Sequence, residues 1–128
     1  MDFQEIIWEV KDHIGRITLN RPNKRNPLGP TTVGELCQVL RMAREDPEVR
    51  VLVLSGAGGT FSAGGDLGAL KGAGDGAAAT AGGFADLNLL FTRLGKPTIA
   101  MVQGAAMGGG LGLVVACDLA LAAQSALF

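Results

Sequence analysis

Two glycine-rich stretches are the parts of this sequence best suited to chemistry. One contains Gly64-Gly65 in "SAGGDL", and the other contains Gly108-Gly109-Gly110 in "GAAMGGGLGL". Each follows an apolar run typical of a strand and precedes a segment typical of a helix. A helix N-terminus offers backbone N–H groups without intrahelical partners and a partial positive charge. Two such groups, one from each stretch, could bind a single carbonyl oxygen and stabilise the negative charge that develops on it.

The same glycines have other possible uses. They could simply allow a strand and a helix to pack closely, because glycine is conformationally versatile. Nucleotide binding is not supported, since the Walker pattern is absent and a G-x-G-x-x-[GA] match at Gly72, Gly74 and Ala77 follows no strand. Cys37 and Cys117 lie in apolar patterns without metal-ligand spacing. We therefore expect two reduced core thiols and no metal site.

The composition indicates a folded protein without a strongly charged surface. Of the 128 residues, 48% are hydrophobic and 18% are charged, and the net charge is −1. This balance argues against a disordered chain, a nucleic-acid surface and adhesion to anionic membranes. The opening residues are acidic and amphipathic, and the apolar run Leu111–Ala123 is interrupted by Asp118 and too short to span a bilayer. The sequence predicts a cytoplasmic protein of one domain, or part of a larger one.

Strand and helix patterns alternate along the chain. The first two strands are predicted to meet at a tight turn over Asp12–Gly15, where His13 is expected to be a solvated residue. A helix is expected near Thr32, because Thr32 and Glu35 have capping-box spacing. Its apolar face should consist of Val33, Leu36, Cys37 and Leu40. Residues 72–83 are predicted to be a mobile loop or frayed helix, and Leu113–Ala123 to be buried. The alternation predicts an α/β fold with right-handed crossovers, with strands at 3–10, 14–20, 49–56, 98–102 and 119–123 and a later helix at 84–94.

Four segments resemble, in order, the enoyl-CoA hydratase/isomerase (crotonase) family: "ITLNRPNKRNPLG", "FSAGGDL", "KPTIAMVQGAAMGGGLGL" and "CDLALAAQSALF". The resemblance runs from about Ile17 to Phe128. It implies a crotonase-like spiral of ββα units, with residues 1–128 as the N-terminal part of an acyl-CoA-binding domain truncated before the C-terminal helical region. It also implies an acyl-CoA thioester substrate, no separate cofactor, and a homotrimer or hexamer in the full-length protein.

The resemblance also assigns site residues. The N–H groups of Gly65 and Gly109 would form the oxyanion hole for the thioester carbonyl. The coenzyme pocket would include Ala63, Gly65, Asp66, Leu67 and Gly68, and Lys24 and Arg25 would meet the nucleotide phosphates. Lys24 and Arg25 could equally be solvated surface charges, and Asp66 could equally cap a turn.

Two departures from the family pattern leave the reaction open. Hydratases of this family commonly place a glutamate where this sequence has Gly112, which argues against hydration by two carboxylates. Double-bond isomerisation or another thioester reaction is the alternative. The chain also ends before the region of the second catalytic acid. Asp75 and Asp86 are the only candidate acids, and each could be a surface carboxylate; Asp118 is expected to bind backbone donors. The alternative function is a non-catalytic acyl-CoA-binding or assembly subunit.

Overall fold

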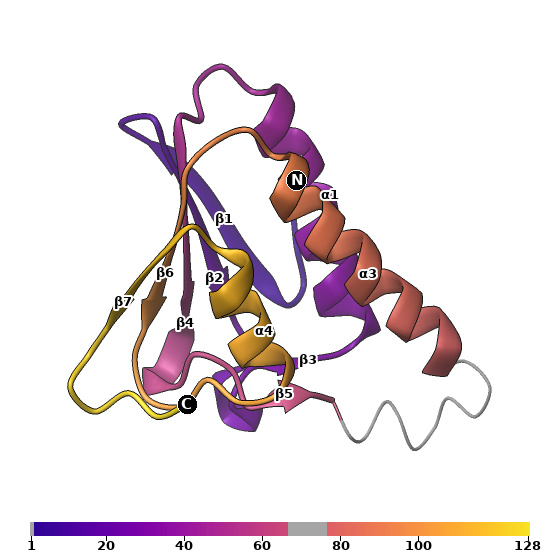
Figure 1. The fold of residues 1–128 in the computed structure, drawn as a ribbon, viewed down its shortest axis with the longest axis vertical. Helices are drawn as coiled ribbons and strands as arrows, with labels where there is room; N and C mark the ends of the chain where they lie inside the picture. The colour runs from indigo at the N-terminus through magenta and orange to yellow at the C-terminus, as the bar shows by residue number, and fades with distance from the viewer. Residues whose placement is uncertain (1, 67–76) are drawn as a thin grey trace.

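The computed structural model describes residues 2–66 and 77–128, and the chain begins with a β-hairpin (Figure 1). Its strands are β1 (Ile6–Lys11) and β2 (Ile14–Leu19). Asp12 and His13 form the turn with φ values of 54° and 64°. The predicted turn over Asp12–Gly15 was therefore two residues too long, because Ile14 and Gly15 already pair with β1.

The hairpin is one edge of a five-stranded sheet with the order β1-β2-β4-β6-β7. Strands β4 (Val51–Gly56), β6 (Thr98–Val102) and β7 (Leu119–Ala122) follow in parallel, so only β1 and β2 are antiparallel. One face of the central strands β2, β4 and β6 is covered, which gives a continuous apolar core. Its buried strand residues include Ile17, Leu19, Leu52, Leu54, Ala100 and Val102.

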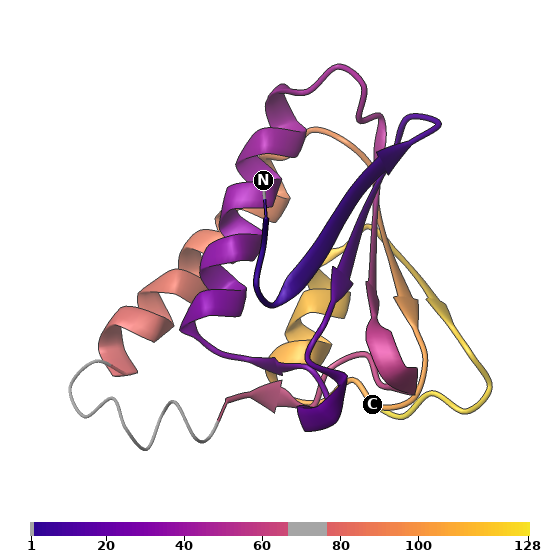
Figure 2. The same cartoon turned by 180° about the vertical axis from the view of Figure 1, so that it is seen from behind.

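Three helices, α1 (Pro30–Glu45), α3 (Ala77–Arg93) and α4 (Gly109–Ala116), lie on the same side of the sheet in both views (Figures 1 and 2). The expected apolar face of α1 is confirmed, since Val33, Leu36, Cys37 and Leu40 are buried. Parallel strands joined by helices on one face confirm the α/β fold that the alternation predicted. Together with the small second sheet described below, they form the spiral of ββα units that the family resemblance implied.

The capping box predicted for α1 was wrong. The helix begins at Pro30, and no side chain caps it; proline is well suited to the first helical position. The Thr32 hydroxyl instead donates to the Glu5 carboxylate, and the Glu35 carboxylate accepts the N–H groups of Gln4 (2.6 Å) and Glu5 (2.9 Å). These side chains therefore fasten the N-terminal segment to α1.

Helix α3 is longer than the sequence indicated. It starts at Ala77 rather than near Phe84, so residues 77–83 are helical, while residues 72–76 lie outside the described residues. Alanine, which is repeated at the start of this helix, has the highest helix propensity of all residue types. Packing of α3 against α1 then stabilises the helix beyond its intrinsic propensity.

A second, smaller sheet joins successive turns of the spiral. Strand β3 (Pro27–Leu28) pairs in parallel with β5 (Gly64–Gly65). Isolated parallel bridges continue this arrangement from Ser62 to Ala106 and from Ala105 to Leu127. The two 3-10 turns η1 (Pro22–Lys24) and η2 (Ala57–Gly59) lie beside it. The second sheet therefore places both glycine stretches at the same end of the fold.

The predicted burial of Leu113–Ala123 is confirmed for Leu113 and Val114, but most of this apolar region is exposed. Every residue of β7 is exposed, with Leu119 at 61% and Leu121 at 64%, and Val115 of α4 is 74% exposed. The reason is topological, because β7 is the edge strand of the sheet and no described element packs over its side chains. No helix in the described part of the chain has the length and apolarity needed to cross a membrane.

We expect the isolated 128-residue chain to self-associate through β7, because an edge strand with exposed leucines readily pairs with another chain. The double variant Leu119→Glu/Leu121→Glu should shift the protein toward the monomer in sedimentation velocity. Ile7→Glu is the matched control, since Ile7 is an exposed apolar residue on the opposite edge strand. An unchanged distribution for the double variant would show that β7 is not the associating surface.

Candidate functional site

The two glycine stretches are in direct contact. Gly64 has φ +100°, and a Cβ atom built on it would lie 2.8 Å from the Met107 carbonyl oxygen and 3.4 Å from the Gly109 nitrogen. A Cβ atom on Gly108 would in turn lie 3.8 Å from the Gly64 Cα. The segments are more than forty residues apart in sequence, and this approach requires glycine at position 64.

The amide of Gly65 points away from β3. Asp66 donates its N–H to the Leu28 carbonyl at 3.3 Å, as part of the parallel pairing between β3 and β5. Along a strand, successive residues direct their amides to opposite sides, so the Gly65 N–H points to the side opposite β3. Gly65 itself is exposed. Among the residues that the structure describes, no hydrogen bond is found that uses this N–H, so it is open to a ligand.

Gly109 is the first residue of α4. Gly110 donates its N–H to the Met107 carbonyl (2.8 Å) and Gly112 to the Gly108 carbonyl (3.1 Å). Within residues 2–66 and 77–128, no hydrogen bond uses the Gly109 N–H. An unpaired amide at the start of a helix also carries part of the positive end of the helix dipole. The position is thus suited to binding an oxygen with negative charge.

Apolar side chains border Gly109. A Cβ atom at this position would lie 3.2 Å from the Phe84 ring and 3.3 Å from a Leu28 methyl group. Phe84 is half-buried and belongs to α3, whereas Leu28 is fully buried in β3. Apolar groups beside a backbone donor lower the local dielectric and strengthen its electrostatic interactions.

Asn26 connects the proline-rich segment to the loop after β4. Its side-chain N–H groups donate to the carbonyls of Ala57 (2.9 Å) and Thr60 (2.8 Å), and its side-chain oxygen accepts the Arg21 N–H (2.8 Å). Asn26 is 1% exposed and has φ +53°, a conformation that asparagine tolerates better than most residues. These bonds hold in place the loop that contains Lys24 and Arg25, called the basic loop below.

We expect Asn26→Asp to lower the free energy of unfolding by about 3 kcal/mol, because the buried carboxylate would face two carbonyl oxygens without a donor. Burial favours the neutral carboxyl and raises its pKa above the unfolded value. The loss should therefore be smallest below the unfolded pKa and grow as the pH rises through the folded pKa. Urea denaturation at several pH values measures this, and a pH-independent loss would contradict it.

The basic loop lies beside the first glycine stretch. Ala63 donates its N–H to the Arg25 carbonyl at 2.9 Å, so Arg25 and Ala63 are neighbours in space. Lys24 and Arg25 are exposed, and a hollow of about 290 Å³ is lined by residues 20–24, including Lys24. The structure thus brings together Lys24, Arg25, Ala63 and Gly65, whereas Leu67 and Gly68 lie outside the described residues.

Asp66 is part of an ion-pair chain. Its carboxylate lies 2.9 Å from Nη1 of Arg21, and Nε of Arg21 lies 3.6 Å from the Glu5 carboxylate. These three side chains are mostly buried. The contact with Arg21 fixes the end of β5 against the segment that precedes η1.

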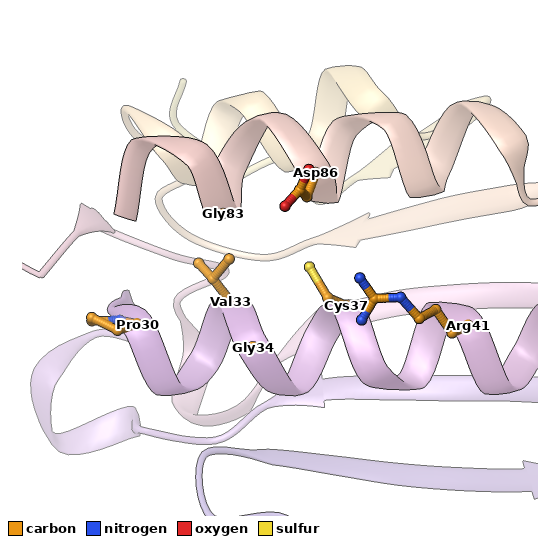
Figure 3. Close-up of a pocket in the computed structure, with 7 residues that line it drawn as sticks. All are labelled: Pro30, Val33, Gly34, Cys37, Arg41, Gly83 and Asp86. Atoms are coloured by element: carbon orange, nitrogen blue, oxygen red, sulfur yellow. The ribbon is translucent and has the colours of Figure 1, made fainter. Parts of the chain in front are cut away.

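Asp86, one of the two candidate acids, faces away from the glycines. It lies in a groove of about 330 Å³ between α1 and α3, together with Cys37 and Arg41 (Figure 3). Two residues along a helix are on nearly opposite faces, so Asp86 and Phe84 point in different directions. Burial raises the pKa of the Cys37 thiol, Arg41 opposes this and Asp86 adds to it. Asp75 lies outside the described residues.

The remaining titratable candidates have structural roles. The Asp118 carboxylate accepts the Thr98 N–H at 2.9 Å, which confirms that it binds a backbone donor. Burial raises the pKa of Cys117 to about 11, with a Thr98 hydrogen bond lowering it and Asp118 raising it. Both cysteines are free thiols. His13 lies 3.2 Å from the Glu48 carbonyl at the hairpin turn.

No group of three or more metal-binding side chains is found within the part of the chain that the structure describes. Sequence reasoning missed Arg21, Asn26 and Ser62, which organise the loops around the glycines. Only Asn26 carried a local signal, because an asparagine before proline is typical of a turn. The roles of Arg21 and Ser62 depend on partners that are tens of residues away in sequence, Asp66 and Asn26.

Comparison with known proteins gives the same family throughout. The sequence model of the enoyl-CoA hydratase/isomerase family matches residues 9–128. A solved enoyl-CoA hydratase/isomerase from Xanthobacter autotrophicus Py2 is 34% identical, with a TM-score of 0.94 over 99% of this chain and 49% of that chain. A protein from Legionella pneumophila described as an enoyl-CoA hydratase/isomerase (crotonase) is 37% identical, with a TM-score of 0.91 over 98% and 50%. An enoyl-CoA hydratase from Shewanella pealeana is 30% identical, with a TM-score of 0.91 over 97% and 48%.

This chain spans about half the length of the solved structures that it matches, which cover it almost completely. The agreement extends over both sheets and the three helices described above, and the family model includes both glycine stretches. Fold, sequence identity and matched range point the same way, and the chain belongs to the enoyl-CoA hydratase/isomerase (crotonase) family.

Proposed function

We propose that this chain provides the thioester-binding half of an acyl-CoA enzyme. The N–H groups of Gly65 and Gly109 bind the thioester carbonyl oxygen from two sides and act as an oxyanion hole. The observation that carries the proposal is the contact between the two glycine stretches. It places the first residue of α4, with its N–H group unused among the described residues, beside the strand that holds Gly65.

Polarisation of the carbonyl has two chemical consequences. It makes the α-carbon more acidic, so that a base can remove a proton to give an enolate-like intermediate. It also makes the β-carbon of an enoyl thioester electrophilic, so that water can add there. The two amides stabilise negative charge on the oxygen in either case, and rigid donors of this kind need no reorganisation during the reaction.

The coenzyme portion of the substrate would extend toward the basic loop. Ala63 and the exposed Lys24 and Arg25 lie on the side of β5 where the Ala63–Arg25 backbone contact joins the two segments. Lysine and arginine suit phosphate groups because both carry permanent positive charge at neutral pH. Leu67 and Gly68 complete the proposed pocket. Relatives named enoyl-CoA hydratases support this class of substrate.

The group that moves the proton is a separate question. Asp66 follows Gly65 directly, but its carboxylate is engaged by Arg21 at 2.9 Å, and Asp86 lies in the groove between α1 and α3. Position 112 carries no carboxylate, although a Cβ atom there would meet nothing within 4 Å. We propose that a carboxylate from outside residues 1–128 supplies this step, and that the full-length protein is a homotrimer or hexamer.

A second candidate function is a non-catalytic acyl-CoA-binding or assembly subunit. Gly112 favours it, because the side chain that could hold a catalytic carboxylate is missing while the surrounding space is open. Such a subunit would keep the coenzyme and carbonyl contacts and lack turnover.

Titration and turnover assays separate the two functions. The enzyme hypothesis predicts that the protein binds butyryl-CoA and converts at least one enoyl thioester, for example crotonyl-CoA or its 3-enoyl isomer. Binding of butyryl-CoA without conversion of any enoyl thioester would favour the binding subunit. Failure to bind either butyryl-CoA or free coenzyme A would contradict both.

A further inference from the structure

Ser62 contacts both glycine stretches and the proline-rich loop that ends at Asn26. Its hydroxyl donates to the Asn26 carbonyl at 2.7 Å and accepts the Gly64 N–H at 3.1 Å. The serine is 0% exposed, so neither contact is exchanged with water. These contacts use the single O–H donor and one of the two acceptor positions of the hydroxyl.

The backbone of Ser62 holds the second glycine stretch. Its N–H donates to the Ala105 carbonyl at 3.1 Å, and its carbonyl accepts the Met107 N–H at 3.0 Å. These bonds form the isolated parallel bridge between Ser62 and Ala106. Met107 is two residues before Gly109 and accepts the Gly110 N–H at 2.8 Å. The start of α4 is therefore tied to the main chain of Ser62.

The first turn of α4 also packs directly on this serine. A Cβ atom at Gly110 would lie 2.6 Å from the Ser62 carbonyl oxygen, 2.8 Å from its Cβ and 3.0 Å from its hydroxyl oxygen. Nothing larger than glycine fits at position 110 without moving one of the two segments. The side chain of Ser62 thus lies between the proline-rich loop, the first glycine stretch and the helix.

We infer that the Ser62 hydroxyl is a positioning group that fixes the Gly65 N–H relative to the Gly109 N–H, an inference that rests on the proposed function. The main chain of Ser62 sets the position of Gly109 through Met107. Its side chain sets the position of Gly65 through the Gly64 N–H. One residue therefore connects both amides. Loss of the hydroxyl frees only the Gly65 N–H, because Gly109 is held by the main chain of Ser62.

This geometry gives a specific expectation for Ser62→Ala. The variant keeps both backbone bonds to Ala105 and Met107, so α4 stays in place. It leaves the Gly64 N–H and the Asn26 carbonyl without their shared partner, and Gly65 can move away from its position. A shift of this size at a catalytic group can lower a rate by roughly 10–100-fold, and hydrogen bonds weaken steeply with poor geometry.

The test is isotope-edited infrared spectroscopy of butyryl-CoA labelled with ¹³C at the thioester carbonyl. Binding to the original protein should lower the carbonyl stretching frequency, and Ser62→Ala should reduce this shift to roughly half. Affinity for free coenzyme A should fall much less than the carbonyl shift, because Lys24, Arg25 and the Ala63–Arg25 backbone bond are unchanged in this variant. Ser62→Cys, which keeps a donor at the same position but a weaker and somewhat larger one, should give an intermediate shift.

Thr32→Val is the matched control, because Thr32 is also a buried hydroxyl with two side-chain contacts, to Glu5 and to Pro27. It should lower thermal stability comparably and leave the carbonyl shift at its original value. Absence of any shift with the original protein would refute the proposed function. A full shift in Ser62→Ala and Ser62→Cys would refute the positioning role alone.

Discussion

Gly109→Pro is expected to reduce turnover of an enoyl thioester by roughly 10²–10³-fold, the usual cost of removing one oxyanion-hole donor. Proline lacks the N–H group that we assign to the carbonyl oxygen. Gly109 is the first residue of α4, where proline is well accepted and where the missing N–H breaks no hydrogen bond with a described residue. The substitution therefore acts on the donor more than on the helix. Turnover of crotonyl-CoA measures the rate, and the infrared shift of bound butyryl-CoA measures polarisation directly.

Gly109→Ala is the control at the same position. Alanine keeps the N–H group but places a methyl group 3.2 Å from Phe84 and 3.3 Å from Leu28, so it reproduces the crowding that the proline Cβ introduces. Its effect on the carbonyl shift should be small, and any loss of stability should resemble that of the proline variant in thermal denaturation. Equal loss of polarisation in both variants would mean that crowding, and not the N–H group, is responsible.

The sequence predicted the repeating strand–helix order well, because each element carries its own pattern. The apolar face of α1 and the β-branched run of β4 are local signals, and the structure confirms both. The adjacency of the two glycine stretches is not a local signal. It was expected from strand ends that meet at one edge of a fold, and the contact between Gly64 and the start of α4 agrees with it. The roles of Gly65 and Gly109 stay predictions.

The failures have a common physical origin in long-range partners. Thr32 and Glu35 have the spacing of a capping box, yet both bind the segment around Glu5, almost thirty residues earlier. The strand Leu119–Ala122 has the composition of a core strand, yet it is the edge of the sheet and exposed. The spacing of apolar residues shows which side chains a segment could bury. The position of that segment in the sheet determines whether another element covers those side chains.

Asn26 and Ser62 show the same limit at the site. A buried polar side chain is stable only where its donors and acceptors are paired. The groups to which Asn26 and Ser62 donate lie 31 to 36 residues away in sequence. No spacing rule anticipates such pairs. Glycine-rich stretches in a sequence indicate where backbone N–H groups could bind a ligand. The side chains that position this backbone are identified only from the structure.

Gly64→Ala should lower the free energy of unfolding by about 4 kcal/mol or more. The φ value of +100° is strained for any residue with a side chain, which costs about 1–3 kcal/mol. The new methyl group would also lie 2.8 Å from the Met107 carbonyl oxygen, and overpacking adds about 1–3 kcal/mol. Relief of that overlap would separate the two glycine stretches, so acyl-CoA polarisation should be lost together with stability. Urea denaturation and the butyryl-CoA infrared shift measure the two effects.

Gly112→Ala is the contrasting variant in the second glycine stretch. Its Cβ atom would meet nothing within 4 Å, and the position lies inside α4, where alanine is favoured over glycine by about 1 kcal/mol. It should therefore stabilise the protein and leave the carbonyl shift unchanged. The two substitutions should change the free energy of unfolding in opposite directions for one reason. At position 64 the absence of a side chain lets two chain segments approach, whereas at position 112 an added Cβ atom would contact no other group. Similar destabilisation by both substitutions would mean that the contact between the glycine stretches does not hold the site together.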